Sequence, residues 1–157
     1  MSAAELVTAA IAKGLRLTTA ESCTGGMVSA AVTEAPGASA IFERGFVTYS
    51  NDAKHELLDV THYSLDNFGA VSEQVAAEMA KGALQNAKAD IAVSITGIAG
   101  PGGSEHKPEG RVCFGLCQIG QPDRTETIEF GALGRAMVRQ KATQHALALL
   151  KTAVHRT

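Results

Sequence analysis

Short runs of β-forming residues alternate with segments of helical periodicity along most of the chain. The strand-like runs lie at residues 15–20, 45–50, 91–95, 111–119 and 125–130. Such alternation favours an α/β fold in which helices cover both faces of one sheet. Only a turn at 120–123 separates the last two runs, so they are expected to form a hairpin within a mixed sheet.

Glycine, proline and capping side chains mark where the helices begin and end. Gly14 is expected to stop an N-terminal helix, and Thr24 to cap the next one, which Pro36 ends. Ser72 is expected to begin a further amphipathic helix, and the last helix is predicted over 135–155. We expect one domain over residues 1–157, because no repeat and no linker divides the sequence.

Composition argues against several classes of protein. Hydrophobic residues make up 45% of the 157 residues and charged residues 19%, which is typical of a globular domain. A formal net charge of −2 offers no basic surface for nucleic acid, although a few local donors can hold the phosphate of a small nucleotide.

The sequence shows no signal-peptide layout and no apolar run long enough to span a bilayer, so we expect a cytoplasmic protein without a membrane partner. Whether the chain forms a homo-oligomer stays open.

Three cysteines carry no disulfide or zinc pattern. Cys23, Cys113 and Cys117 are odd in number and form no paired CxxC, so neither a disulfide framework nor a zinc site is expected. Cys113 and Cys117 lie in a strand-like run and are expected to be buried thiols. No metal ion and no cofactor is predicted.

The segment AESCTGG, at residues 20–26, places a hydroxyl nucleophile between a strand and a helix. Helix N-termini carry unpaired N–H groups that stabilise a developing oxyanion, and glycines permit close approach of a substrate carbonyl. The segment therefore predicts Ser22 as nucleophile, with Cys23, Thr24, Gly25 and Gly26 around the substrate. In the alternative interpretation, Ser22 merely ends a strand. Cys23 is the rival nucleophile, but the sequence offers it no recognisable cysteine-hydrolase signature.

Lys54 is the candidate base for this nucleophile. An ordinary lysine has a pKa of about 10.4, so only about one in a few thousand is neutral at pH 7. Desolvation or a neighbouring cation must lower the pKa of Lys54 before it can accept a proton. Tyr49, on the preceding strand-like run, is placed to pass a proton or to orient the serine. The alternative for Lys54 is an ordinary solvated surface charge.

A glycine-rich loop at residues 97–110 follows the buried strand-like run at 91–95. The loop is neither a Walker A loop nor a dinucleotide fingerprint, but its N–H groups can form an anion-binding nest. The candidate substrate-binding residues here are Thr96, Gly97, Gly100, Gly102, Gly103 and Arg111. In the alternative interpretation, the loop is a rigid surface connection.

The same segments resemble the CinA C-terminal domain family. AESCTGG is similar to the first motif of that family, and the stretch from Phe42 to Lys54 is similar to the second. Residues 69–72 and 96–103 resemble two more motifs, so the likeness spans nearly the whole chain. The resemblance implies a three-layer α/β/α sandwich with a mixed, mostly parallel sheet and no metal. It also implies hydrolysis of the carboxamide of nicotinamide mononucleotide to nicotinate mononucleotide and ammonia.

The resemblance also implies roles for individual residues. Ser22 takes the family's nucleophile position and Lys54 its general-base position, with Tyr49 close to the same site. The chain resembles the stand-alone form, because no larger domain precedes it in the sequence. Two segments depart from the family pattern. Arg111 stands where a threonine is common, and Leu133-Gly134-Arg135 stands where Gly-Asp-Arg is expected.

Two other functions stay open from the sequence alone. The first alternative is a nucleotide-binding or regulatory module that keeps the pocket without turnover. The second is an amidase for another small carboxamide.

Overall fold

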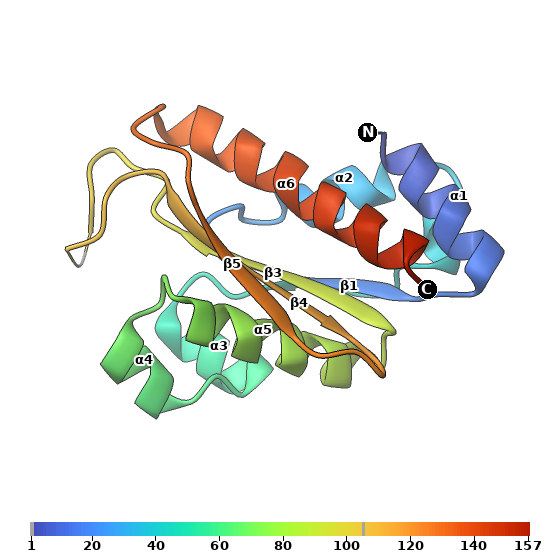
Figure 1. Ribbon diagram of the computed structural model, residues 1–157, viewed down its shortest axis with the longest axis horizontal. Helices are drawn as coiled ribbons and strands as arrows, with labels where there is room; N and C mark the ends of the chain where they lie inside the picture. Colours follow the sequence, from blue (N-terminus) through green and yellow to red (C-terminus); the bar gives the residue numbers. More distant parts are fainter. Residues whose placement is uncertain (1, 105) are drawn as a thin grey trace.

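A five-stranded sheet lies between two layers of helices in the computed structural model, which describes residues 2–104 and 106–157 (Figure 1). The strands are β1 (Leu17–Glu21), β2 (Phe46–Val47), β3 (Ile91–Gly97), β4 (Arg111–Gln118) and β5 (Arg124–Glu129). Their order across the sheet is β2-β1-β3-β4-β5. β1 pairs in parallel with β2 and β3, whereas β4 pairs antiparallel with β3 and β5. Four of the five strands therefore run in one direction, and the mixed sheet with a β4–β5 hairpin is confirmed.

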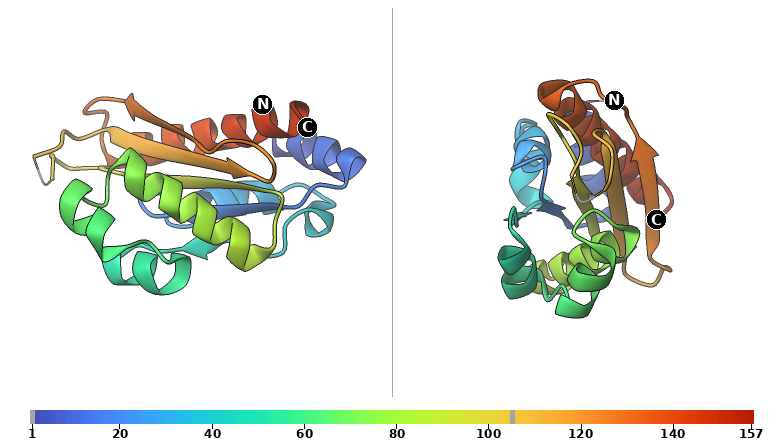
Figure 2. Two further views of the ribbon diagram at one scale, coloured as in Figure 1. Left: turned by 60° about the horizontal axis from the view of Figure 1, so that its bottom comes forward. Right: turned by 90° about the vertical axis from the view of Figure 1, so that its left-hand side faces the viewer.

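Helices cover both faces of this sheet, as Figures 1 and 2 show. One layer contains α1 (Ala3–Lys13), α2 (Met27–Thr33) and α6 (Arg135–His155). The other contains α3 (Asn51–Leu58), α4 (His62–Phe68) and α5 (Glu73–Ala87). A short 3-10 helix, η1 (Ala38–Ala40), lies between α2 and β2 along the chain. This arrangement is the three-layer α/β/α sandwich that the sequence predicts.

The core is divided by the sheet into two parts. Along β3, Ile91, Val93 and Ile95 pack in the cluster that α1, α2 and α6 complete. Ala92 packs in the cluster formed with α3, α4 and α5, together with Met79 of α5. Successive side chains of a strand point to opposite faces, so one short strand contributes to both cores.

Glycine and serine delimit most helices as predicted, but Thr24 does not. Gly14 ends α1 in the left-handed conformation, with φ of 65°, and the Ser72 hydroxyl accepts from the first turn of α5. By contrast, α2 begins after Gly26, which makes no side-chain cap, and the Thr24 hydroxyl donates to Glu21 Oε1 at 2.7 Å. The prediction that Thr24 caps α2 is therefore wrong, because its hydroxyl serves a buried carboxylate instead.

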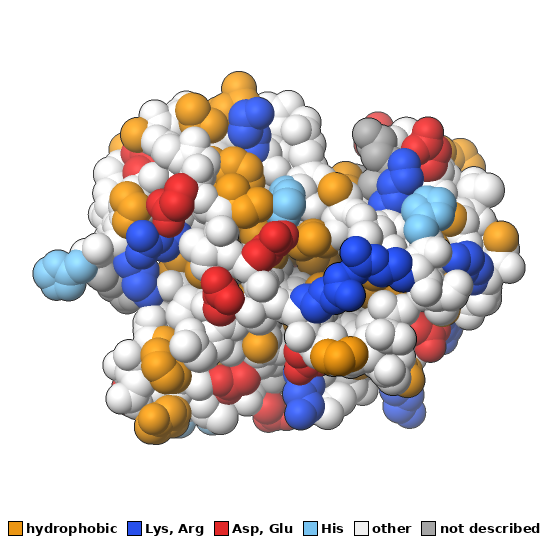
Figure 3. Space-filling view, in the orientation of Figure 1, with side chains coloured by type: hydrophobic (Ala, Val, Ile, Leu, Met, Phe, Trp, Pro, Cys, Tyr) orange, Lys and Arg blue, Asp and Glu red, His pale blue; other side chains and the backbone are white. Residues whose placement is uncertain are grey.

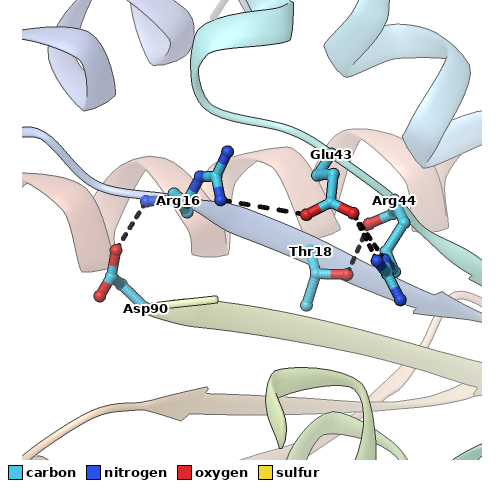
Figure 4. Close-up of polar contacts among 5 residues, drawn as sticks. All are labelled: Arg16, Thr18, Glu43, Arg44 and Asp90. Atoms are coloured by element: carbon cyan, nitrogen blue, oxygen red, sulfur yellow. Dashed lines mark hydrogen bonds and ion pairs between the residues drawn. The ribbon is translucent and has the colours of Figure 1, made fainter. Parts of the chain in front are cut away.

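Polar contacts hold the segment that leads into β2 against β1 (Figure 4). The buried Thr18 hydroxyl donates to the backbone carbonyl of Arg44 at 2.7 Å, and the Arg16 N–H donates to Asp90 Oδ2 at 2.8 Å. Glu43 makes exposed ion pairs with Arg44 and Arg16, which stabilise the fold little because water screens them. The Thr18 contact thus anchors this segment together with the backbone hydrogen bond from the Leu17 N–H to the Ile41 carbonyl, at 2.7 Å, and the segment continues into β2 and α3.

The parallel strands β1 and β3 bring two candidate segments to one edge of the sheet. Residues after Glu21 and after Gly97 emerge at the same edge, because the two strands pair in register and in parallel. The chain then leaves β1 toward β2 and leaves β3 toward β4, on opposite sides. Ligand-binding crevices form at such switch points in α/β sheets. In Figure 1 the glycine-rich loop and the start of α6 extend past this edge, whereas both chain ends lie at the other.

The surface carries charges of both signs. Figure 3 shows acidic and basic side chains interspersed over the face that Figure 1 presents. Within residues 2–104 and 106–157, no helix combines the length and apolar character needed to cross a membrane. In that same part of the chain, no group of three or more His, Cys, Asp or Glu side chains is arranged to hold a metal ion.

Candidate active site

Ser22 and Lys54 meet in the crevice beyond β1. Lys54 Nζ lies 2.8 Å from Ser22 Oγ, although the two residues are 32 positions apart. Ser22 directly follows β1, and Lys54 lies in the first turn of α3, where the Ser50 hydroxyl caps the helix. The side chains are 7% and 1% exposed, respectively. The interpretation of Lys54 as a solvated surface charge is therefore wrong.

The surroundings of Lys54 suit an amine that gives up its proton. Nζ also donates to the backbone carbonyls of Thr48 at 2.9 Å and Tyr49 at 3.3 Å, so the three N–H groups of the ammonium form have three acceptors. In the neutral amine, the two carbonyls retain two N–H groups, which directs the lone pair toward Ser22 Oγ. Burial lowers the pKa of Lys54 from 10.5 to about 8. In about a tenth of the protein molecules the Lys54 amine is then neutral at pH 7.

Cys23 lies in a setting that keeps its thiol protonated. Its side chain is buried, and burial raises the pKa of the Cys23 thiol to about 12. Since the thiolate is the reactive form of cysteine, this environment favours Ser22 over Cys23 as the nucleophile.

The carboxylate of Glu21 fills the N-terminus of α2. Oε1 accepts from the Thr24 hydroxyl and from the N–H groups of Gly26 and Val28, at 2.7, 3.2 and 2.9 Å. Oε2 accepts from the N–H and the hydroxyl of Ser29, at 2.9 and 2.7 Å. These five contacts satisfy a fully buried carboxylate beside a helix start, where negative charge is favourable. Sequence reasoning missed this role, although a glutamate ahead of two glycines and a helix is a usable signal for it.

The hydrogen bonds of Glu21 narrow the choice of oxyanion donors. The Gly26 N–H donates to Glu21, and the Gly25 N–H donates to the backbone carbonyl of Ser22 at 3.0 Å. Within the described residues, the N–H groups of Cys23 and Thr24 have no oxygen partner. The N–H that follows the nucleophile supplies an oxyanion donor in many α/β hydrolases. The two glycines therefore shape the turn, with φ of 57° and 108°, and Cys23 and Thr24 hold the free donors.

A cavity of about 230 Å³ opens over Ser22. Six predicted residues line it: Ser22, Cys23, Tyr49, Lys54, Thr96 and Gly97. Seven further residues line it that were not among the predicted site residues: Asn51, Ala70, Val71, Ile98, Ala99, Ser104 and Arg135. The Thr96 hydroxyl donates to the carbonyl of Ala70 at 2.8 Å and so ties the wall from the α4–α5 connection to β3.

Several predicted substrate-binding residues lie outside the cavity lining. Gly100, Gly102 and Gly103 shape the loop above it, with Gly100 and Gly102 at φ of 96° and 77°. Thr24 is fully buried beneath the turn, where it contacts Glu21. Arg111 pairs with Glu129 at 2.5 Å across β4 and β5. The structure thus places the Arg111 charge away from Ser22 and does not support substrate contact by this residue.

Tyr49 lies at the rim of the cavity rather than between Ser22 and Lys54. Its side chain is 62% exposed, and its hydroxyl accepts from Arg135 Nη2 at 3.0 Å. Its contact with Lys54 comes from the backbone carbonyl. This geometry gives no support to a proton relay through the Tyr49 phenol. Arg135 Nη1 also donates to the carbonyl of Gly100 at 2.8 Å, so one guanidinium joins two sides of the rim.

Arg139 holds the turn after Ser22 from the α6 side. Its Nε donates to the carbonyl of Cys23 at 3.0 Å and its Nη2 to that of Thr24 at 3.4 Å.

A larger hollow of about 520 Å³ lies between β5 and α6, lined by apolar side chains and by charged residues that include Asp123 and Arg124. The Ser22 cavity is the candidate active site because of its nucleophile and base, not because of its size.

Comparison with known proteins adds to this geometry. The CinA C-terminal domain family matches residues 1–154. The nicotinamide-nucleotide amidohydrolase PncC of Enterobacter agglomerans is 52% identical over 145 residues, which cover 91% of this chain and 87% of that protein. A CinA-like protein of Chlorobium phaeobacteroides is 50% identical over 85% of this chain, which spans 33% of that longer protein. The crystal structure of competence/damage inducible protein CihA from Agrobacterium tumefaciens superimposes with a TM-score of 0.93 at 44% identity, over 98% of this chain and 93% of that one.

Proposed function

Since this chain belongs to the CinA C-terminal domain family, we propose that it hydrolyses the carboxamide of nicotinamide mononucleotide to nicotinate mononucleotide and ammonia. The observation that carries the proposal is the buried contact of 2.8 Å between Lys54 Nζ and Ser22 Oγ. The 52% identity to a relative named nicotinamide-nucleotide amidohydrolase supports the choice of substrate. The reaction belongs to the salvage of pyridine nucleotides.

Acyl transfer through Ser22 fits the geometry. Neutral Lys54 accepts the hydroxyl proton as Ser22 Oγ bonds to the carboxamide carbon, and the N–H groups of Cys23 and Thr24 stabilise the oxyanion. The Lys54 ammonium then gives this proton to the leaving nitrogen, so the C–N bond breaks and ammonia departs. A water molecule that loses a proton to Lys54 attacks the acyl-enzyme. The Ser22–carbon bond breaks, and the proton returns to Ser22.

The phosphate end of the substrate is assigned to the mouth of the cavity. Arg135 offers a guanidinium there, and a guanidinium matches the geometry of phosphate oxygens. The stretch from Thr96 to Ala99 forms the adjacent wall and holds the ribose-phosphate in place, with Ser104 as a further donor.

Ammonia release from three substrates tests this function. We expect kcat/KM to be highest for nicotinamide mononucleotide and about 100-fold lower for nicotinamide riboside, because hydrogen bonds to a charged group stabilise by about 1.5–3 kcal/mol each. Nicotinamide alone, which also lacks the ribose, is expected to be poorer still. Binding of the mononucleotide without ammonia release indicates the regulatory module instead. Equal kcat/KM for mononucleotide and riboside indicates an amidase for other small carboxamides.

The pH dependence of the rate tests the role of Lys54. Burial lowers the pKa of Lys54 to about 8, and the base must be neutral, so kcat/KM is expected to rise with pH and to level off above about pH 8. The rise from pH 7 to the plateau is expected to be about tenfold, because about a tenth of the amine is neutral at pH 7. The measurement is kcat/KM for ammonia release between pH 6 and 10. A rate that falls as pH rises through 8 contradicts a neutral lysine as the base.

A further inference from the structure

Glu109 connects the glycine-rich loop to the beginning of α6. Its Oε1 accepts from the Gly102 N–H at 2.6 Å, and its Oε2 accepts from the Gly134 N–H at 3.2 Å. Gly134 is the N-cap of α6, and the next residue is Arg135. One carboxylate therefore holds both the loop and the helix terminus from which Arg135 projects.

This carboxylate supplies what the start of α6 lacks. Gly134 makes no side-chain cap, and no acidic residue stands in the first turn of the helix. In a capping box, a glutamate inside the helix accepts from the N-cap N–H. Here Glu109 makes that contact from a segment 25 residues earlier and brings negative charge to the positive end of the helix.

The loop also packs directly on Glu109. A Cβ at Gly100 would lie 2.5 Å from Glu109 Oε1, so only glycine permits this approach. The carbonyl of Gly100 in turn accepts from Arg135 Nη1 at 2.8 Å. Loop and helix are thus joined in both directions, by a carboxylate that accepts from two N–H groups and by a guanidinium that donates to the loop and to Tyr49.

We propose that Glu109 is a positioning residue that holds Arg135 over the cavity and thereby sets the affinity for the phosphate end of the substrate. The inference rests on the proposed function, in which Arg135 contacts the phosphate. Without Glu109, the loop at Gly102 and the helix start at Gly134 lose their common support. Arg135 then spends less time in the orientation that faces the cavity.

Steady-state kinetics with and without the substrate phosphate test this inference. Glu109→Ala is expected to raise KM for nicotinamide mononucleotide about tenfold, to leave kcat within about twofold, and to leave both parameters for nicotinamide riboside unchanged. Arg135→Ala is expected to show the same pattern. The double variant is expected to be no worse than Arg135→Ala, since the two residues act on one contact.

Glu109→Gln keeps the size of the side chain but only one acceptor oxygen, so its KM is expected to lie between those of wild type and Glu109→Ala. Glu129→Ala removes a carboxylate that pairs with Arg111 away from the cavity and is the matched control, expected to behave as wild type.

The outcomes separate the inference from the function on which it rests. If Arg135→Ala affects the mononucleotide alone and the Glu109 variants affect neither substrate, the inference is overturned and the phosphate contact stands. An equal loss on both substrates in the Glu109 variants also overturns it, because that loss reflects general structural damage. If the wild type releases no ammonia, the proposed function fails. Calorimetric Kd values for the mononucleotide, measured with the same variants, then decide whether Glu109 acts on phosphate affinity.

Discussion

Ser22→Ala is expected to lower kcat for ammonia release from nicotinamide mononucleotide by about a thousandfold or more, because the acyl-enzyme loses its oxygen nucleophile. Cys23→Ala is the matched control, since it removes the neighbouring side chain from the same turn. Burial raises the pKa of the Cys23 thiol to about 12, so this variant is expected to keep kcat within about tenfold of wild type. Mass spectrometry of rapidly quenched reactions is expected to find the acyl group on Ser22 in wild type and in Cys23→Ala.

The reverse pattern identifies a different nucleophile. If Ser22→Ala retains ammonia release while Cys23→Ala abolishes it, the thiol forms the acyl intermediate and the proposed serine mechanism is wrong. Retention of full activity in both variants excludes covalent catalysis at this turn.

Lys54→Met is expected to abolish ammonia release to a similar degree and to change how stability depends on pH. Methionine keeps the length of the side chain but has no lone pair that can accept the Ser22 proton. Burial lowers the pKa of Lys54 to about 8 in the folded protein, compared with 10.5 in the unfolded chain. Between pH 8 and 10.5 the unfolded chain binds more protons than the folded protein, so the contribution of Lys54 to the free energy of unfolding rises with pH over this range. Below pH 8 that contribution is unfavourable and does not change with pH.

Denaturant unfolding at a series of pH values measures this effect. The free energy of unfolding of wild type minus that of Lys54→Met is expected to increase by about 3 kcal/mol from pH 8 to 10.5, since one pKa unit corresponds to about 1.4 kcal/mol. A difference that stays constant across this range shows that the pKa of Lys54 is not lowered in the fold. Lys88→Met provides a control for general effects of removing a lysine.

The sequence predicts most of the fold because glycine, proline and capping residues mark the ends of its helices clearly. Gly14 and Pro36 end the first two helices close to where they are expected, and the last helix occupies the predicted residues 135–155. The helix α4 was not predicted, because seven residues with little apolar periodicity resemble a loop. The expected strand at 45–50 shortens to Phe46–Val47, because this edge segment pairs with β1 over only two residues.

Local motifs predict one part of the candidate site, whereas the other part depends on contacts between segments far apart in the sequence. Ser22 and Lys54 are found from motifs in the sequence and meet as the resemblance implies. The sequence marks Arg135 only as part of a segment that departs from the family pattern, and it gives no sign of Glu109, because the roles of both residues depend on contacts with segments far along the chain. The contact between Arg135 and Tyr49 joins residues 86 positions apart, and no pattern within either segment predicts this contact.

The buried carboxylate of Glu21 also removes a competing anion site from the neighbourhood of Ser22. The N-terminus of a helix readily binds an anion, and here the N–H groups at the start of α2 donate to the protein's own carboxylate. Within the proposed function, the helix start therefore has, among the described residues, no free N–H group to offer the substrate phosphate, and the guanidinium of Arg135 at the mouth of the cavity is left to bind it. The capping carboxylate thus favours one placement of the phosphate without any contact with the substrate itself.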